Sequence, residues 1–411
     1  MGLLRWPLVA VVFGLGGLAC AWAIPDVAVA GGLAVAAAIA AMFLLRCLHP
    51  PGGGTALLAV GGYGRGELLP HSDVDVLLLL PDDASVLPDS PLKAMVEAFI
   101  TACWDIGLEI GSSVRNVAEC VLEARADQTV QTSLLESRLV CGARKMHTQF
   151  QRETAALMDA KAFLRAKTLE MHQRHTKFDN TPYALEPNCK ESPGGLRDLQ
   201  LVMWVARAAG LGRSWSELAT NGLITPFEVK QLQRQEGTLR LIRARLHAVA
   251  GRREDRLVFD LQTAVAESIG YTSTRAQRSS EVLMHRYYWA AKAVTQLNQI
   301  LMLNIEERIN ASEAAPMRPI NERFLDRAGM LEVARDDLYV QQPHAILETF
   351  LLFEQDPGIQ GLSARTLRAL YNARNLMDGK FRRDPVNRAL FMSILQQPQS
   401  ITHAMRLLNQ T

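Results

Sequence analysis

The chain has 411 residues, a length that accommodates two or more domains with sizeable cores. Its 44 basic and 42 acidic residues leave a net charge of +2, which argues against a polyanion such as nucleic acid as its partner. Six cysteines are scattered without paired spacing, a usage that favours a reducing compartment and argues against a zinc site.

Residues 1–50 form an apolar segment for which we expect helical structure. Residues 7–24 and 27–45 are uncharged runs of 18 and 19 residues, each near the length that spans a bilayer. Arg5 and Arg46 flank them, so the positive-inside rule predicts a hairpin in the inner membrane, with both ends in the cytoplasm. Three alternatives stay open: a signal peptide, buried core helices, and a start codon downstream of Met1.

The most informative stretch follows, where a glycine-rich turn separates two apolar runs. The first run predicts a strand over residues 56–60 that ends at Gly61 and Gly62, whose backbone N–H groups can approach a phosphate. Arg65 lies in the same turn and offers a bidentate phosphate contact. Ser72 supplies a hydroxyl just before the second run.

The second run predicts a strand over residues 74–80 that carries an Asp-x-Asp pair. Side chains alternate along a strand, so Asp73 and Asp75 share one face about 7 Å apart, while Val74 and Val76 face the core. A glycine turn or an Asp-x-Asp pair alone is weak support for a site. Together, in an apolar strand where an unpaired charge is costly, they favour a metal site with Asp73 and Asp75 as Mg²⁺ ligands.

From about residue 117 to 408 the apolar spacing is helical and strand-like runs are scarce. A Pro-Gly-Gly loop at 193–195 leads into an amphipathic helix that we expect to begin near Asp198. Taken alone, this loop is best interpreted as a structural turn with Asp198 as the helix N-cap. The basic residues at 252, 253 and 256 are offset by acidic ones at 254 and 255, which predicts a salt-bridged helix end.

Several of these blocks, in this order, resemble the protein-PII uridylyltransferases of the DNA polymerase β-like nucleotidyltransferase superfamily. The resemblance extends over about residues 55–398 and rests on GGYGRGEL at 61–68, SDVD at 72–75, YALEPNCKESPGGLRDL at 183–199, RLVFDLQ at 256–262 and TLRAL at 366–370. Several ordered motifs are far more specific than one.

The resemblance implies an α+β fold: a small mixed-sheet nucleotidyltransferase domain at residues 51–145, then a mostly helical domain at 146–411. It implies a third catalytic acid, for which Glu109 is the candidate. Relatives commonly carry histidine where Ser112 stands, which puts any role of that histidine in doubt here. With the resemblance, Lys190 and Arg197 are expected to line the site, and the nucleotide-binding set becomes Gly61, Gly62, Arg65, Gly66, Ser72, Lys190 and Arg197.

The function implied is the Mg²⁺-dependent transfer of a uridylyl group from UTP to a tyrosine of a PII-type nitrogen-signalling protein. Two alternatives are an adenylyltransferase acting on glutamine synthetase or another protein, and a catalytically inert truncated paralogue. The chain has no His-Asp dipeptide, so we expect the uridylyl-removing and glutamine-sensing activities of longer relatives to be absent. No stretch reveals which base is selected.

Overall fold

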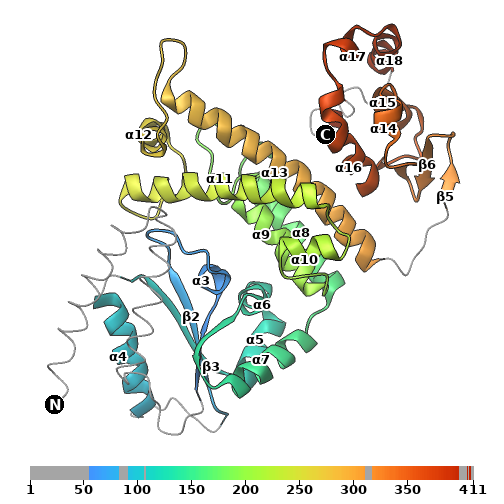
Figure 1. Cartoon of the computed structure of the whole chain (residues 1–411). Coiled ribbons are helices and arrows are strands. Elements are labelled where there is room, and N and C mark those ends of the chain that lie inside the picture. The colour runs from blue at the N-terminus through green and yellow to red at the C-terminus, as the bar shows by residue number, and fades with distance from the viewer. Residues whose placement is uncertain are drawn as a thin grey trace. The chain divides into compact units, whose positions relative to one another are not determined.

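The computed structural model describes residues 55–82, 91–105, 108–310 and 317–397, together with residues 405, 407 and 408 (Figure 1). The apolar segment predicted at residues 1–50, and with it the membrane hairpin, lies outside the described residues. Within the described part of the chain, no helix combines the length and the apolar character needed to cross a membrane.

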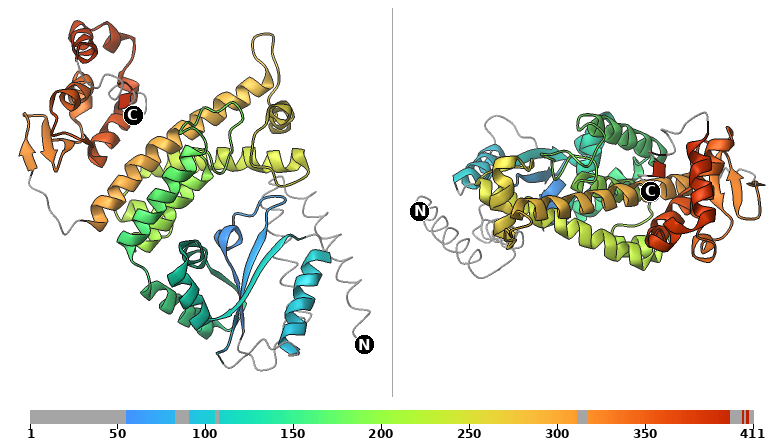
Figure 2. Two further views of the ribbon diagram at one scale, coloured as in Figure 1. Left: turned by 180° about the vertical axis from the view of Figure 1, so that it is seen from behind. Right: turned by 90° about the horizontal axis from the view of Figure 1, so that it is seen from above.

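A mixed four-stranded sheet, present as predicted, opens the described chain. Its order is β3-β2-β1-β4, with β1 antiparallel to both β2 and β4 and with β2 parallel to β3. The strands are β1 (Ala56–Ala59), β2 (Val74–Leu80), β3 (Ile110–Asn116) and β4 (Arg138–Gly142). Helix α4 (Pro91–Asp105) covers one face, and α5 (Val117–Ala126), α6 (Gln128–Leu135) and α7 (Arg144–Ala156) cover the other (Figures 1 and 2).

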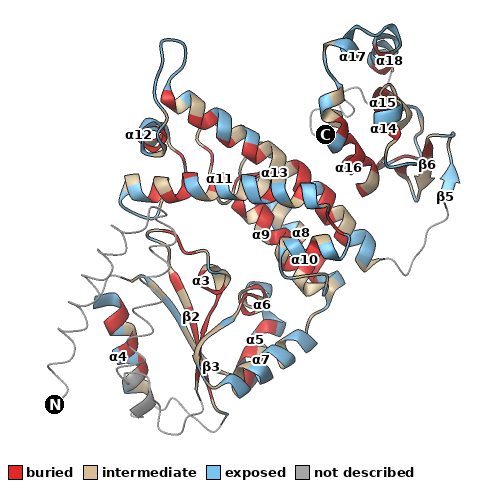
Figure 3. Cartoon of the chain, viewed as in Figure 1, coloured by how far each residue is buried: buried red, intermediate tan, exposed pale blue. Residues whose placement is uncertain are grey.

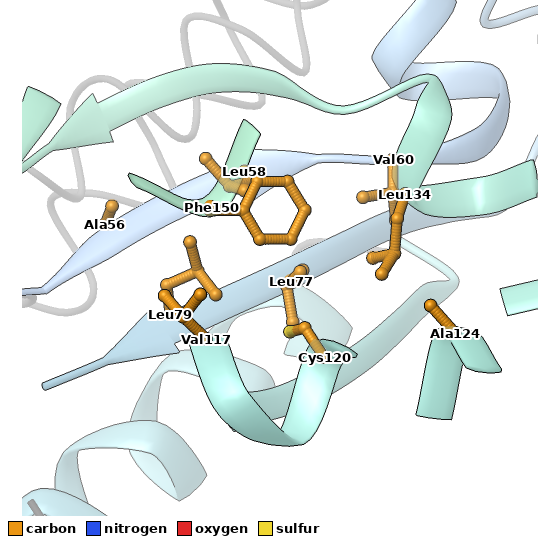
Figure 4. Packing of buried hydrophobic residues seen from close by; sticks show 10 residues of the cluster. All are labelled: Ala56, Leu58, Val60, Leu77, Leu79, Val117, Cys120, Ala124, Leu134 and Phe150. Carbon is orange, nitrogen blue, oxygen red and sulfur yellow. The ribbon is translucent and has the colours of Figure 1, made fainter. Parts of the chain in front are cut away.

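Both faces of β2 are buried, which accounts for its nearly continuous apolar sequence. Val74 and Val76 pack with residues of α4, as the alternation predicts. Leu77 and Leu79 pack on the opposite face, and Figure 3 shows the buried residues along the strand. Figure 4 shows that second cluster around the ring of Phe150, with the residues Ala56, Leu58, Val60, Leu77, Leu79, Val117, Cys120, Ala124 and Leu134. Asp75 shares the face of Leu77, because the two positions are two residues apart.

The remaining chain up to residue 310 is helical, as the periodicity predicts. Its helices are α8 (Ala160–Thr176), α9 (Leu196–Ala208), α10 (Trp215–Thr220), α11 (Pro226–Ala250), α12 (Phe259–Ile269) and α13 (Ser279–Ile309). Helix α9 begins at Leu196, just ahead of the expected start near Asp198, which lies buried in its first turn.

The last described part holds a second four-stranded sheet that the sequence did not predict, of order β5-β6-β7-β8. The strands are β5 (Met317–Pro319), β6 (Phe324–Arg327), β7 (Met330–Val333) and β8 (Gly361–Leu362), too short to produce a visible alternation. The helical elements beside them are α14 (Leu338–Gln341), α15 (Ala345–Gln355), α16 (Ala364–Ala373), η1 (Arg374–Leu376), α17 (Gly379–Arg383) and α18 (Pro385–Leu395). In α16 the Thr366 hydroxyl donates to the Leu331 carbonyl at 2.8 Å, which gives the TLRAL stretch a structural role.

The chain divides into two compact units whose sequences interleave. Among the described residues, the first unit comprises those between 55 and 196 together with 236–288, and the second comprises 197–235 together with those from 289 onward. The boundaries between the units fall at the start of α9, within α11 and within α13. The candidate active site below is built within the first unit.

Candidate active site

Asp75 lies between two glycines that leave room for its carboxylate. Its neighbour across the parallel pairing is Gly111 on β3, where a Cβ atom would stand 2.5 Å from Asp75 Oδ1. Gly61 approaches from the other side, and a Cβ there would stand 2.9 Å from Oδ2. Any larger residue at either position displaces this carboxylate, so the two glycines position it.

The electrostatic environment of Asp75 favours binding of a cation. Burial and the nearby Asp73 carboxylate raise the pKa of Asp75 above its ordinary value, while the cationic groups of Arg253, Lys190 and Arg65 act in the opposite direction. A divalent cation between two carboxylates relieves the same repulsion. Asp73 and Asp75 come together as predicted, and Lys190 joins them from a distant part of the sequence.

The predicted glycine turn is a short helix, α3 (Gly61–Arg65), that begins directly after β1. The first N–H groups of a helix have no acceptor within it, so Gly61 and Gly62 present these donors at the edge of the sheet. Gly61 has a φ of +55°, a left-handed conformation that favours glycine. Gly66 ends α3 with a φ of +75°.

Neighbouring strands hold α3 in place. A Cβ on Gly64 would lie 2.2 Å from the Glu136 carbonyl oxygen, so the helix packs directly on the chain that leads into β4. Arg138 on β4 donates to the Tyr63 carbonyl at 3.0 Å, and its guanidinium lies 5.2 Å from the Tyr63 ring centre. The glycine turn is therefore fixed before any ligand binds.

Arg65 and Ser72 both have partners within the protein. The Arg65 guanidinium donates to Glu67 at 2.7 Å and to Glu136 at 2.5 Å, and its side chain is only 14% exposed. These two ion pairs use Nε and Nη1 of the guanidinium and hold Arg65 against Glu67 and Glu136. The Ser72 hydroxyl accepts from the Leu69 N–H at 3.1 Å and stabilises the turn before Asp73.

Lys190 lies in a loop whose backbone is tightly folded. Asn188 Oδ1 accepts from the N–H groups of Lys190 and Glu191, at 3.0 and 2.7 Å. A Cβ on Gly195 would lie 2.7 Å from the Lys190 carbonyl oxygen. The glycine and asparagine of the YALEPNCKESPGGLRDL block thus fold the loop that brings Lys190 near Asp75.

Glu109 directly precedes β3, whose first residue pairs with Val74, and Arg197 lies in the second unit. Glu109 is exposed, and its carbonyl accepts from the Val74 N–H at 2.8 Å. Among the described residues, no group of three or more His, Cys, Asp or Glu side chains is arranged to hold a metal ion. Arg197 belongs to the second unit, where it donates to Gln200 at 2.8 Å and lies over Trp204. The catalytic role of Glu109 and the phosphate contact of Arg197 stay predictions.

The sequence interpretation missed a buried polar cluster behind the site. His247 on α11 is fully buried and contacts the Pro70 carbonyl through Nδ1 and Asp255 through Nε2, the latter at 3.2 Å. Arg243 donates to the same Asp255 oxygen at 2.6 Å. Burial acts to raise the pKa of Asp255, but these two hydrogen bonds outweigh it and the pKa falls below 3.8.

The expectation of a salt-bridged helix end at residues 252–256 is therefore only partly met. Arg252 pairs with Glu254 at 2.8 Å, within the segment. Arg253 instead reaches Asp73 at 2.9 Å, and Asp255 holds the cluster described above. The position of His247 on the buried side of α11 was the available signal, but its contact with Pro70 joins residues 177 positions apart and cannot be read from sequence.

The donor set fits magnesium. Asp73 and Asp75 supply hard carboxylate oxygens, and Mg²⁺ typically takes one or two protein carboxylates together with waters and substrate phosphates. Asp75 is half-buried, and the absence of side chains at Gly61 and Gly111 leaves room for its carboxylate. Two carboxylates next to a glycine turn thus suit a magnesium–nucleotide complex.

Family models match most of the described chain. The nucleotidyltransferase domain model matches residues 44–125, the model described as GlnD PII-uridylyltransferase matches 162–302, and the model of the uridylyltransferase GlnD third domain matches 324–411. A model of the HPP transmembrane region matches residues 9–71, mostly outside the described residues.

Curated relatives match the same region. The bifunctional uridylyltransferase/uridylyl-removing enzyme of Cupriavidus metallidurans is 61% identical over 359 residues, which are 87% of this chain and 41% of that protein. The enzymes of the same name from Cupriavidus pinatubonensis and Ralstonia nicotianae are 62% and 60% identical, each over 87% of this chain. This chain spans 40% and 41% of those two proteins.

Proposed function

Because this chain belongs to the PII-uridylyltransferase family, we propose that it transfers a uridylyl group from UTP to a tyrosine of a PII-type signalling protein and releases pyrophosphate. The chain spans about 41% of the length of its relatives, so their activity supports this proposal by similarity. The observation that carries it is the Asp75 carboxylate, packed between Gly61 and Gly111 at the N-terminus of α3.

The residues of the first unit have distinct roles in this proposal. Asp73 and Asp75 hold the metal, and the N–H groups of Gly61 and Gly62 bind phosphate oxygens. Lys190, already close enough to influence the pKa of Asp75, stabilises the charge that develops on the departing pyrophosphate. All of these groups are positioned by folded backbone, so catalysis here is mainly positioning and charge stabilisation.

Bound Mg²⁺ supplies Lewis-acid stabilisation of the transferring phosphoryl group and lowers the pKa of the attacking hydroxyl. The protein residues determine where the nucleotide lies and which face of its α-phosphorus meets the tyrosine. The hydroxyl oxygen forms a bond to the α-phosphorus as the bond from the α-phosphorus to the bridging oxygen of the β-phosphate breaks, pyrophosphate leaves with that bonding pair, and the hydroxyl proton passes to water.

The substitution Asp75→Asn tests this assignment. It removes one metal-ligand charge and keeps the size of the side chain, so we expect transfer of label from UTP to a PII-type protein to stop while the circular dichroism spectrum stays unchanged. The matched control is Asp82→Asn, which changes a carboxylate beyond the end of β2. Wild-type turnover by a folded Asp75→Asn protein would show that the site is assigned wrongly.

A further inference from the structure

Arg253 forms an ion pair with one of the two proposed metal ligands. Its Nη1 lies 2.9 Å from Asp73 Oδ2, although the two residues are 180 positions apart in the sequence. The side chains are 42% and 48% exposed, so water, metal and nucleotide can all reach the pair. The remaining donors of the guanidinium fork suit a second planar or tetrahedral oxyanion.

Both ends of this pair are anchored by the buried cluster behind the site. His247 contacts the carbonyl of Pro70, three residues before Asp73, and also contacts Asp255, two residues after Arg253. The Asp255 carbonyl accepts from the Cys189 N–H at 2.8 Å, next to Lys190. A typical surface ion pair lacks such anchoring, so Arg253 and Asp73 are held as neighbours by the fold itself.

Metal binding at Asp73 conflicts with this pair. The carboxylate oxygen that faces Arg253 is the type of ligand that Mg²⁺ requires, and two cations competing for one exposed carboxylate repel each other. Once the metal takes Asp73, the guanidinium remains beside the site with its donors released. A triphosphate bound to the same metal brings anionic oxygens to this position.

We propose that Arg253 exchanges partners during nucleotide binding: it neutralises Asp73 in the free protein and binds phosphate oxygens of the nucleotide once the metal occupies Asp73. This inference rests on the proposed function. It adds a phosphate-binding residue from the loop after α11 to a site otherwise built from the sheet, α3 and the Lys190 loop. The exchange keeps the local charge balanced before and after the magnesium–nucleotide complex binds.

The test compares Arg253→Gln with wild type in the full chain, with Arg252→Gln as the matched control. Arg252 is 71% exposed and pairs with Glu254, so its substitution removes the same charge one residue away. Mn²⁺ is titrated without nucleotide and followed by electron paramagnetic resonance, and UTP is then titrated in saturating Mg²⁺ by calorimetry. Thermal melting verifies that each variant is folded.

Arg253→Gln should bind free Mn²⁺ about threefold more tightly, because a competitor for Asp73 is gone. It should bind UTP about tenfold more weakly in Mg²⁺, because a charge-assisted contact is lost. Arg252→Gln should change neither affinity. Unchanged or weaker Mn²⁺ binding in Arg253→Gln overturns the inference, and so does wild-type affinity for UTP.

Binding measurements on the wild-type protein distinguish a failure of this inference from a failure of the proposed function. Wild type that binds Mn²⁺ without binding UTP contradicts the proposed function and the phosphate contact together. Wild type that binds UTP normally, with Arg253→Gln indistinguishable from it, contradicts the role of Arg253 alone.

Discussion

Gly111 lies on β3 directly beside Asp75 on β2, and we expect Gly111→Ala to displace the Asp75 carboxylate. The added Cβ would stand 2.5 Å from Oδ1, whereas ordinary contact begins near 3.4 Å, so the oxygen must move by the difference, 0.9 Å. A misplacement of about 1 Å in a catalytic group costs about 100-fold in rate, so we predict a fall of that size in kcat.

The assay measures initial rates of label transfer from UTP to a PII-type protein, together with thermal melting. The overpacking should cost about 1 kcal/mol of stability, which leaves the protein folded at assay temperature. Gly237→Ala is the matched control, because a Cβ at this position in α11 has no neighbour within 4 Å. The control should keep its rate and gain up to about 1 kcal/mol from the better helix former.

A folded Gly111→Ala protein with the wild-type rate would refute this reasoning. It would show either that the Asp75 carboxylate moves without cost to the chemistry, or that Asp75 is not a metal ligand. Mn²⁺ titration of Asp75→Asn distinguishes these cases, because this substitution weakens Mn²⁺ binding only if Asp75 is a metal ligand.

Three further predictions concern stability. Arg65→Gln should cost about 3 kcal/mol in urea unfolding, because it removes the ion pair between Arg65 and the buried Glu136 carboxylate. If Arg65 served only to bind phosphate, the substitution would lower UTP affinity without changing stability. Asp255→Asn should cost about 2 kcal/mol at pH 7. Folding lowers the pKa of Asp255 from 3.8, so its charged form stabilises the fold above that pH and this stabilisation is lost as the pH falls below it. The difference in free energy of unfolding between wild type and Asp255→Asn should therefore shrink in acid. A difference that stays constant with pH would contradict the ion pair. Asp75→Asn should have a higher melting temperature than wild type at neutral pH. Folding raises the pKa of Asp75, so its ionised carboxylate destabilises the folded protein at that pH. A lower melting temperature than wild type would contradict this prediction.

The first sheet and its aspartates were predictable because the relevant signals are local. Val74 and Val76 alternate with Asp75, and the alternation alone placed the valines in the core. The glycine turn was located correctly, although it forms α3 instead of an open turn. Such patterns can be read from the sequence because the burial of a single strand determines which of its positions are apolar.

The rest of the site depends on contacts between distant residues. Arg253 contacts Asp73 only because α11 and the loop after it fold against the sheet. The same applies to Asp255, whose acidic and basic sequence neighbours suggested local pairs. The resemblance implied a site-lining role for Lys190, which influences the pKa of Asp75, whereas spacing alone favoured a structural turn.

The most direct test of the account is label transfer by the full chain, supplied with Mg²⁺, a PII-type protein and either labelled UTP or labelled ATP. Wild type should label the protein from UTP far faster than from ATP, and the doubly substituted protein Asp73→Asn, Asp75→Asn should label it from neither. Equal or faster labelling from ATP, or labelling by the folded double variant, would contradict the proposed uridylyltransferase.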